Sequence, residues 1–286
     1  MTPSEYFSLL LAGMSNVCWP IENLDGILKT TTCPCGQSNE RLRIVGGAVT
    51  SPNQYPFMLL MVRMERLQFL GGATILTERH AVTAAHCTKS LARNAEMGVV
   101  PGVHDKSQLT QNSIVPVTKH LEHEEYSSHT IQNDISLLFL AWPLEFGPNV
   151  SPICLPTKQV SLDNVDATMI GWGTTGSNQA TSKFLKRADV KILSHSECNS
   201  LWPRYNPTPG KFKQICTRGK GQGACLGDSG SPVFYLDPEI FRYVLAGVIS
   251  YGGKECNPDL STVESDVSYY MPWITSHIKK GYCHKV

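Results

Sequence analysis

The feature that most limits what this chain can fold into is a series of short apolar runs that begins after residue 43. Gly, Pro, Asn and Asp residues separate runs such as 55–62, 73–76, 135–140 and 243–250. Runs this short, bounded by turn residues, predict β-strands, and many of them in succession predict an all-β sandwich or barrel. The end of the chain has a helical pattern instead. Pro272 fits a first helical turn, and residues on one face recur at steps of three and four, namely Trp273, Ile274, His277 and Ile278.

Residues 1–43 have no sustained strand or helix period. The stretch 6–14 has the apolar character of a secretory signal, but Glu5 is the only charge before it, where a signal has a positive region. Residues 15–43 carry Cys18, Cys33 and Cys35 and are typical of a linker or pro-segment. Two interpretations of the start stay open: a weak signal peptide, or a chain that is incomplete upstream.

Cysteine content and charge limit the class of protein. Ten cysteines in 286 residues, with 23 Gly and 18 Pro, are typical of a turn-rich chain held by disulfides, which persist in oxidising compartments. We therefore expect a secreted, extracellular protein. Lys and Arg total 25 against 24 Asp and Glu, so no positive excess favours nucleic acid as a partner. No apolar run approaches the roughly 18 residues that a membrane-spanning helix needs.

Three segments carry side chains suited to nucleophilic catalysis. They are Thr83-Ala84-Ala85-His86-Cys87, Asn133-Asp134-Ile135-Ser136-Leu137-Leu138 and Gly227-Asp228-Ser229-Gly230-Ser231-Pro232. Each has an ordinary structural explanation by itself, as a packed histidine, a turn or cap before a strand, and a tight turn. Together they supply a nucleophile in Ser229, a general base in His86 and a carboxylate in Asp134, in the order His, Asp, Ser.

These segments resemble the trypsin/chymotrypsin family of serine endopeptidases over residues 43–278, and within it most resemble insect venom and haemolymph proteases. Three further segments support the resemblance: Arg43-Ile44-Val45-Gly46-Gly47, Gly171-Trp172-Gly173 and Ser250-Tyr251-Gly252. The resemblance implies an all-β fold of two antiparallel six-stranded β-barrels, at about residues 44–155 and 165–270, closed by a C-terminal helix. It also implies a pro-segment at 1–43 and a serine protease domain at 44–286 with a short C-terminal extension.

The resemblance implies a role for each catalytic residue. His86 takes the proton of the Ser229 hydroxyl as it attacks a peptide bond, and Asp134 holds the imidazole in place. The N–H groups of Gly227 and Ser229 form the oxyanion hole, and glycine at 227 suits a backbone that turns its amide inward. Proteins or peptides are then the substrates, and no cofactor is expected.

Arg43-Ile44 resembles the activation cleavage site of the family. A cut there frees the Ile44 amine to pair with Asp228, a carboxylate that is costly to bury alone. The resemblance implies a nearly inactive zymogen and an upstream arginine-specific protease that activates it. The alternative is a basic loop that stays uncut.

The family sets its substrate preference at the residue six before the catalytic serine, which is Gly223 in this sequence. Glycine offers no charge to a substrate Arg or Lys, so we expect cleavage after Leu, Met, Val or Ala, with Phe and Tyr tolerated less well. Gly252 leaves the pocket entrance open, whereas Thr262 narrows its depth. The expected pocket residues are Gly223, Ala224, Leu226, Ser250, Gly252 and Thr262.

Family cysteine positions imply three disulfides: Cys35 with Cys154, Cys198 with Cys216, and Cys225 with Cys256. In a further family pair, Gly71 stands in place of one cysteine, so Cys87 beside His86 has no partner. Cys33 with Cys283 is our pairing for two of the rest, although four remaining cysteines allow three pairings.

Other interpretations are weaker. The stretch 120–129 is rich in His and Glu but lacks the His-Glu-x-x-His spacing of a zinc helix, and Val103 replaces the glutamate of the family's calcium loop, so we expect no metal. We also expect a monomer and serpin-type inhibitors. The alternative function is a catalytically silent homologue that acts as a binding or regulatory module, although all three catalytic residues are present.

Overall fold

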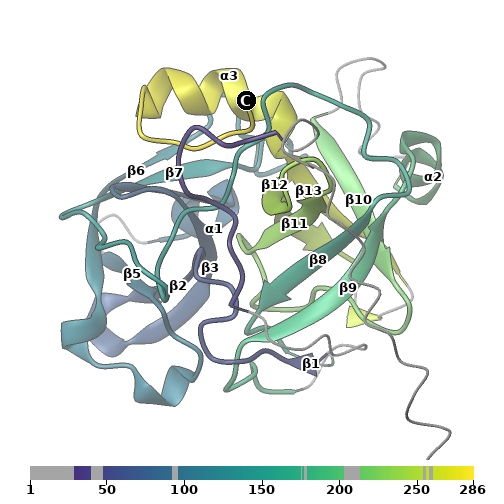
Figure 1. Cartoon of the computed structure of the whole chain (residues 1–286). Coiled ribbons are helices and arrows are strands. Elements are labelled where there is room, and N and C mark those ends of the chain that lie inside the picture. The colour runs from purple at the N-terminus through teal and green to yellow at the C-terminus, as the bar shows by residue number, and fades with distance from the viewer. Residues whose placement is uncertain are drawn as a thin grey trace, which may run out of the picture.

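The computed structural model describes residues 29–39, 48–91, 96–174, 176, 179–202, 213–253, 256–257 and 260–286. Two β-barrels lie side by side in it, and a helix with the C-terminus next to it lies across one end of both (Figure 1). Within these ranges, no helix has the length and apolar composition needed to cross a membrane. The expected cleavage site at Arg43 and Ile44 and the cysteine Cys18 fall outside the described residues.

The first barrel is closed by six antiparallel strands in the order β2-β3-β4-β7-β6-β5. Its interior is filled by aliphatic, methionine and aromatic side chains, and the same core continues into Phe234 and Leu245 of the second barrel. The two barrels therefore share one packed interior. The strands are β2 (Met58–Arg63), β3 (Gln68–Thr77), β4 (His80–Thr83), β5 (Met97–Pro101), β6 (Val115–Glu122) and β7 (Ser136–Leu140).

The second barrel follows the order β8-β9-β10-β13-β12-β11 and closes because β11 pairs back with β8. The prediction of two six-stranded antiparallel barrels is thus confirmed. The strands are β8 (Asp166–Gly171), β9 (Lys186–Ile192), β10 (Gln214–Gly219), β11 (Pro232–Asp237), β12 (Arg242–Gly252) and β13 (Thr262–Asp266).

One short strand differs from the predicted division between the barrels. We expected residues 44–155 to form the first barrel, but β1 (Ala48–Val49) pairs with β9 of the second. The Thr50 N–H and hydroxyl both donate to the Leu185 carbonyl and extend that pairing. Residues 48–50 are therefore hydrogen-bonded to the second barrel before the chain enters the first barrel.

The C-terminal helix α3 (Val267–Ile278) begins earlier than the sequence predicted. Asp266 caps it by accepting a hydrogen bond from the Ser268 N–H, so Pro272 lies inside the helix and not in its first turn. That cap supplies a helix start that the position of proline alone did not indicate. Ile274 and Ile278 are buried as expected, while Trp273 and His277 lie half-buried beside them.

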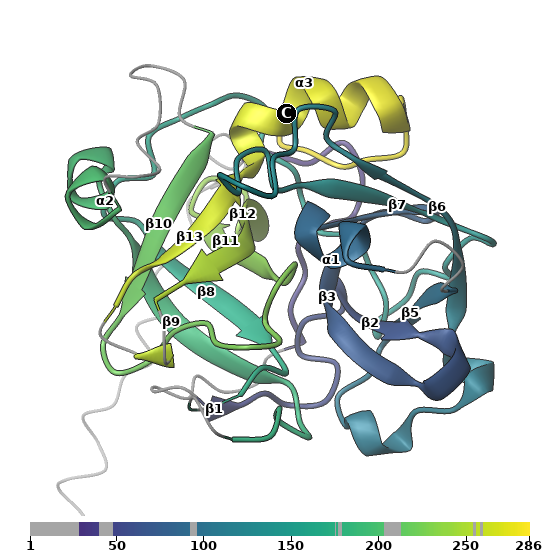
Figure 2. The same cartoon turned by 180° about the vertical axis from the view of Figure 1, so that it is seen from behind.

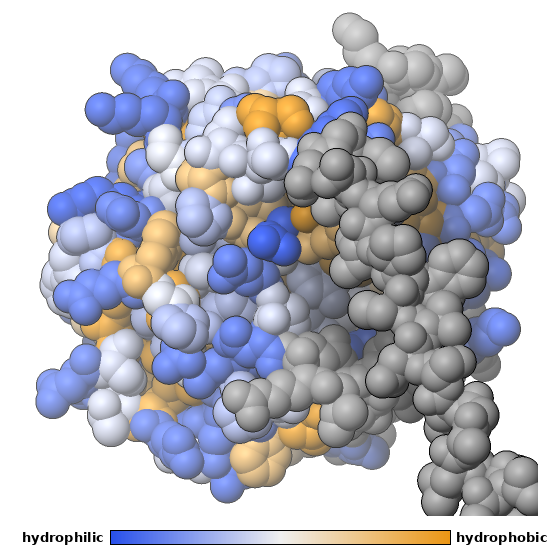
Figure 3. Space-filling view, in the orientation of Figure 1, coloured by the Kyte–Doolittle hydropathy of each residue, from blue (hydrophilic) through white to orange (hydrophobic). Residues whose placement is uncertain are grey.

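The two described ends of the chain lie together and are joined by the Cys33–Cys283 disulfide. Residue Thr31 forms a β-bridge with Lys285, and the Thr32 N–H donates to the His284 carbonyl. On the face in Figure 3, hydrophilic residues predominate and hydrophobic ones form small separate groups. The disulfides are Cys33–Cys283, Cys35–Cys154, Cys198–Cys216 and Cys225–Cys256, which include all three pairs implied by the resemblance.

Candidate active site

Two neighbouring strands of the first barrel bring His86 and Asp134 together. His86 lies in α1 (Ala85–Lys89), directly after β4, and Asp134 lies two residues before β7, which pairs with β4. Figure 2 shows α1 on the side of the first barrel that faces the second. The Nδ1 atom of His86 lies 2.7 Å from Oδ2 of Asp134, and the His86 backbone N–H donates to Oδ1 at 2.8 Å.

The second barrel completes the surroundings of Asp134, which is fully buried. The Ser250 hydroxyl donates to its Oδ2, and the Ser265 hydroxyl donates to its backbone carbonyl at 2.7 Å. Ser250 was expected in the substrate pocket, but its hydroxyl is directed at the carboxylate. Ser265 has no sequence signal of its own, because no motif singles out this serine within the strand Thr262–Asp266.

The Nε2 atom of the His86 ring, on the edge opposite Asp134, contacts a thiol. Cys87 is buried and free, and its Sγ lies 3.5 Å from Nε2 of His86. Burial opposes charge on the ring, but the hydrogen bonds to Asp134 and Cys87 raise the pKa of His86 above its usual range. Within the described residues, Nε2 is hydrogen-bonded to Cys87 and not to the Ser229 hydroxyl.

Ser229 lies in a sharp turn that is hydrogen-bonded to a strand of each barrel. Gly227 and Gly230 have φ angles of 97° and 78°, which favour glycine. The Ser229 carbonyl accepts from the Gly72 N–H of β3 at 3.0 Å, and the Gly230 N–H donates to the Ile249 carbonyl of β12 at 2.9 Å. The turn is thereby fixed at the junction that also holds His86 and Asp134.

The backbone N–H groups of Gly227 and Ser229 are both available. Among the hydrogen bonds of the described residues, neither N–H donates to another protein group, whereas the intervening Asp228 N–H donates to the Cys225 carbonyl. Two free donors on either side of a paired one can receive an oxyanion that forms next to Ser229.

Asp228 lines a cavity of about 200 Å³ next to the Ser229 turn. It accepts from the N–H groups of Gly173 and Cys225 at 2.7 and 2.9 Å. A Cβ atom on Gly171 or Gly173 would lie 2.0 or 2.3 Å from a carboxylate oxygen, so both glycines are needed for this placement. Burial raises the pKa of Asp228 to about 6, and nearby Lys106 and Lys186 oppose that rise.

Only some of the expected pocket residues lie in contact with one another. Gly252 pairs with Thr262, and a Cβ on Gly252 would lie 3.1 Å from the Thr262 methyl group. A Cβ on Gly223 would meet no atom within 4 Å, so that position faces open space. Leu226 is 65% exposed, and Ala224 packs against the core of the second barrel.

Two antiparallel six-stranded barrels with a histidine–aspartate pair and a Gly-Asp-Ser-Gly turn at their junction define a chymotrypsin-like serine protease. The family model described as Trypsin matches residues 44–274, and the chain belongs to that family.

Curated relatives fit this assignment. A venom serine protease from Polistes dominula is 30% identical over 88% of this chain and 91% of its own length. Venom serine protease 34 from Apis mellifera is 34% identical over 89% of this chain and 63% of its own. The clotting factor G beta subunit of Tachypleus tridentatus is 29% identical over 84% of this chain and 81% of its own. The predicted likeness to insect venom proteases is thus confirmed.

Proposed function

We propose that this protein hydrolyses peptide bonds through an acyl-enzyme formed on Ser229. The observation that carries this proposal is the bond from Nδ1 of His86 to the buried Asp134, next to the Ser229 turn. His86 accepts the Ser229 proton and returns it to the leaving amine, while Asp134 stabilises the imidazolium. The N–H groups of Gly227 and Ser229 bind the oxyanion, each contributing about 3 kcal/mol to the transition state.

For this chemistry Nε2 of His86 must exchange its contact with Cys87 for one with the Ser229 hydroxyl. Catalytic hydrogen bonds often tighten only when substrate is bound. A thiol is a weak hydrogen-bonding partner, so the exchange costs little.

We propose that cleavage between Arg43 and Ile44 activates the enzyme. The cavity beside Asp228 supports this, because it offers a buried carboxylate that a new amine could neutralise. Residues 1–43 are then a pro-segment and residues 44–286 the protease domain. An arginine-specific protease makes the cut.

We propose that the primary pocket takes apolar side chains, because Gly223 places no charge there and Thr262 limits its depth. Leu, Met, Val and Ala are then preferred over Phe and Tyr. An arginine anilide hydrolysed at least tenfold faster than leucine, alanine and phenylalanine analogues would overturn this preference.

We also propose that the protein is secreted and acts as a monomer that serpin-type inhibitors can block. The four disulfides within the described residues support an oxidising environment. Venom relatives point to the same compartment.

The test is fluorophosphonate labelling before and after cleavage at Arg43 by an arginine-specific protease. We expect labelling of Ser229 only in the cut protein, and none in Ser229→Ala or in uncut Arg43→Gln. Folded, cut protein that takes no label would favour the silent homologue. Full labelling of Arg43→Gln would refute the activation step.

A further inference from the structure

A lysine is held in place beside the proposed oxyanion hole. Lys106 begins the short 3-10 helix η3 (Lys106–Gln108), which lies between β5 and β6 of the first barrel. Its ammonium lies 4.1 Å from the centre of the Phe69 ring and donates to the Thr181 hydroxyl at 2.7 Å. A Cβ atom on Gly227 would lie 3.0 Å from that ring and 3.2 Å from the Thr181 methyl group. The two side chains that hold the Lys106 ammonium therefore also border Gly227.

The backbone at Lys106 is anchored to the second barrel. The Lys106 N–H donates to the Lys183 carbonyl at 2.9 Å, and the preceding residue, Asp105, forms a β-bridge with Phe184. The backbone bonds, the ring and the hydroxyl together restrict where the ammonium can lie. A side chain that is already restricted loses less conformational entropy when it binds an anionic group.

Among the described residues, no carboxylate forms an ion pair with Lys106. The adjacent Asp105 pairs with Lys183 instead, at 3.2 Å. Asp228 acts on Lys106 electrostatically, but its oxygens accept from the N–H groups of Gly173 and Cys225. Burial lowers the pKa of Lys106 and Asp228 opposes that change, so the ammonium is partly withdrawn from water. A partly withdrawn cation without an ion pair favours an anionic group from outside the protein.

We expect the leaving half of a cleaved peptide on the same side of the site as Lys106. A Cβ on Gly71 of β3 would lie 3.7 Å from the Cys87 thiol, and that thiol is 3.5 Å from Nε2 of His86. Nε2 returns its proton to the leaving amine in the proposed reaction, so the amine forms beside β3, the strand that also carries Phe69. The expected primary pocket belongs to the second barrel. A peptide with a side chain in that pocket would therefore extend its leaving half over the first barrel, toward Lys106.

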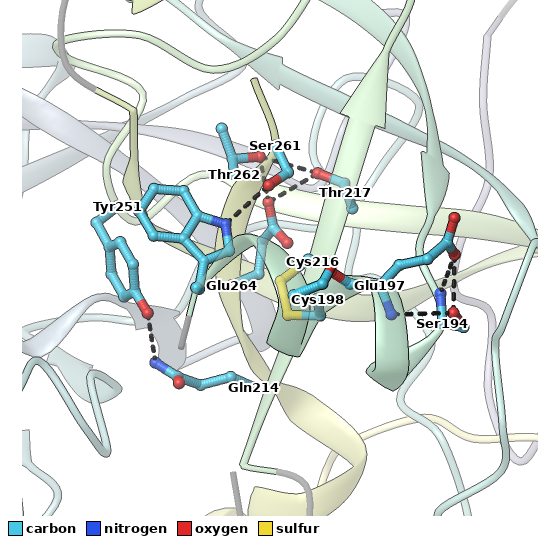
Figure 4. The surroundings of a disulfide bond; sticks show 12 residues. Ser194, Glu197, Cys198, Gln214, Cys216, Thr217, Tyr251, Ser261, Thr262 and Glu264 are labelled. Atoms are coloured by element: carbon cyan, nitrogen blue, oxygen red, sulfur yellow. Dashed lines mark hydrogen bonds between the residues drawn. A yellow bond between two sulfur atoms is a disulfide. The ribbon is translucent and has the colours of Figure 1, made fainter. Parts of the chain in front are cut away.

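None of the expected primary-pocket residues carries a charge. Glu264, two residues after the expected pocket residue Thr262, is fully buried and accepts from the Thr262 hydroxyl at 2.6 Å. Figure 4 shows this pair in the surroundings of the Cys198–Cys216 disulfide, which joins α2 (His195–Leu201) to β10. Selection of a charged substrate side chain therefore falls to the leaving side of the site.

We propose that Lys106 selects substrates with a glutamate or aspartate at the second residue after the cut bond. The proposal rests on the proposed protease activity and names a substrate class for it. An extended peptide advances about 3.4 Å per residue, so this acidic residue lies about 7 Å from the oxyanion hole. The contacts from Gly227 to the Phe69 ring and from that ring to the Lys106 ammonium span a similar length. The substrate carboxylate then pairs with Lys106 at the edge of the Phe69 ring.

Two peptides that differ only in one charge test the proposal. Both have norleucine at the cleavage position, and the second residue after the cut bond is glutamate in one peptide and glutamine in the other. For the cut enzyme at low salt, we expect kcat/KM to be up to about fivefold higher for the glutamate peptide, the size of a partly exposed ion pair. The ratio of the two values should fall toward one at high salt, because salt screens that pair.

Lys106→Met keeps most of the side-chain stem and removes the charge, so its glutamate-to-glutamine ratio should be close to one. Lys106→Glu should instead favour a peptide with lysine at the same position. Lys119→Met is the matched control, because Lys119 also lies over a ring, 5.2 Å from the centre of Phe139, which pairs with His80 at the start of β4. This control should retain the wild-type ratio. A ratio near one in the wild-type enzyme, or an unchanged ratio in folded Lys106→Met, would overturn the proposal.

A binding measurement separates the role of Lys106 from the protease activity. Fluorescence anisotropy of the two labelled peptides with cut Ser229→Ala protein should show tighter binding of the glutamate peptide. Adding Lys106→Met to that variant should make the two affinities equal. Equal affinities in Ser229→Ala alone would overturn the role of Lys106. Cut wild-type protein that binds the peptides with this preference but hydrolyses neither would instead refute the protease activity.

Discussion

At the scale of single residues, the contact between Cys87 and His86 separates this site from a simple histidine–aspartate pair. The thiol lies against Nε2, which would receive the Ser229 proton in the proposed reaction, and it helps to raise the pKa of His86. A raised pKa keeps the imidazole charged to a higher pH, and the charged ring cannot accept the Ser229 proton. Activity should therefore be lost as the pH falls through the His86 pKa.

Replacing the thiol should move this limit. In Cys87→Ala the His86 pKa falls, so the acid limb of kcat/KM for norleucine substrates should shift to lower pH. Cys87→Ser keeps a hydrogen-bonding group and should shift the limb less. An acid limb at the same pH in wild type and Cys87→Ala would show that the thiol does not act on His86.

The aspartate partner is the stronger influence on the ring. Asp134→Asn should lower kcat by about 10⁴-fold, the size of this effect in the trypsin family. Circular dichroism should show that the fold survives, because the Ser250 and Ser265 hydroxyls can still bond the asparagine and its backbone. Loss of less than tenfold would mean that Asp134 does not orient the base.

Gly173 tests how the Asp228 carboxylate positions the Ser229 turn. In Gly173→Ala the new Cβ would lie 2.3 Å from that carboxylate, so Asp228 must move and distort the adjacent oxyanion N–H groups. We expect a loss of kcat/KM and of about 1–3 kcal/mol of stability by thermal melting. Gly147→Ala is the control, because a Cβ at that glycine meets no atom within 4 Å. Equal behaviour of the two variants would contradict this role for Gly173.

The proposed catalytic side chains could be selected from sequence because each stands inside a recognisable local segment. Their nearness follows from the pairing of β4 with β7 and from the turn at Ser229. The contact of Ser265 could not be predicted in the same way. Its hydroxyl donates to the Asp134 carbonyl, a bond between residues far apart in the chain that depends on how the two barrels meet.

At the scale of elements, the apolar runs predicted strands at the right places. The start of the helix α3 differs from the prediction because it is set by a capping residue. The runs 55–62, 73–76, 135–140 and 243–250 overlap β2, β3, β7 and β12. Strand pairing is long-range, so the sequence did not reveal that residues 48–49 join β9. The position of Pro272 alone places the start of α3 too late, because Asp266, a favoured cap residue, begins the helix at Val267.

The Asp266 cap gives a prediction for α3. Asp266→Ala removes the acceptor of the Ser268 N–H and should cost about 1 kcal/mol in chemical denaturation. Ser276→Ala, on the exposed side of the same helix, should change stability by less than about 0.5 kcal/mol. Equal losses in the two variants would argue against the cap.

At the scale of the whole molecule, the uncut protein carries a buried carboxyl that prefers its proton. Because the pKa of Asp228 is raised in the folded protein, the folded chain binds this proton more tightly than the unfolded chain does. The resulting stability is present in acid and is lost as the pH rises from about 4 to about 6, by up to about 3 kcal/mol. Urea denaturation of uncut protein should show this loss, and Asp228→Asn should lack it. A parallel pH dependence in both would contradict the assignment.

The disulfides Cys33–Cys283 and Cys35–Cys154 give the proposed cleavage a covalent consequence, because both enclose the Arg43–Ile44 bond. Before the cut the backbone and these bonds form two linked rings. The cut opens the loop between Cys35 and Cys154, which spans 119 positions, and leaves one smaller ring made of residues 33–35 and 154–283. Opening a loop of that size returns about 5 kcal/mol of conformational freedom to the denatured chain. Activation would therefore release no fragment, yet it would make the denatured state easier to reach.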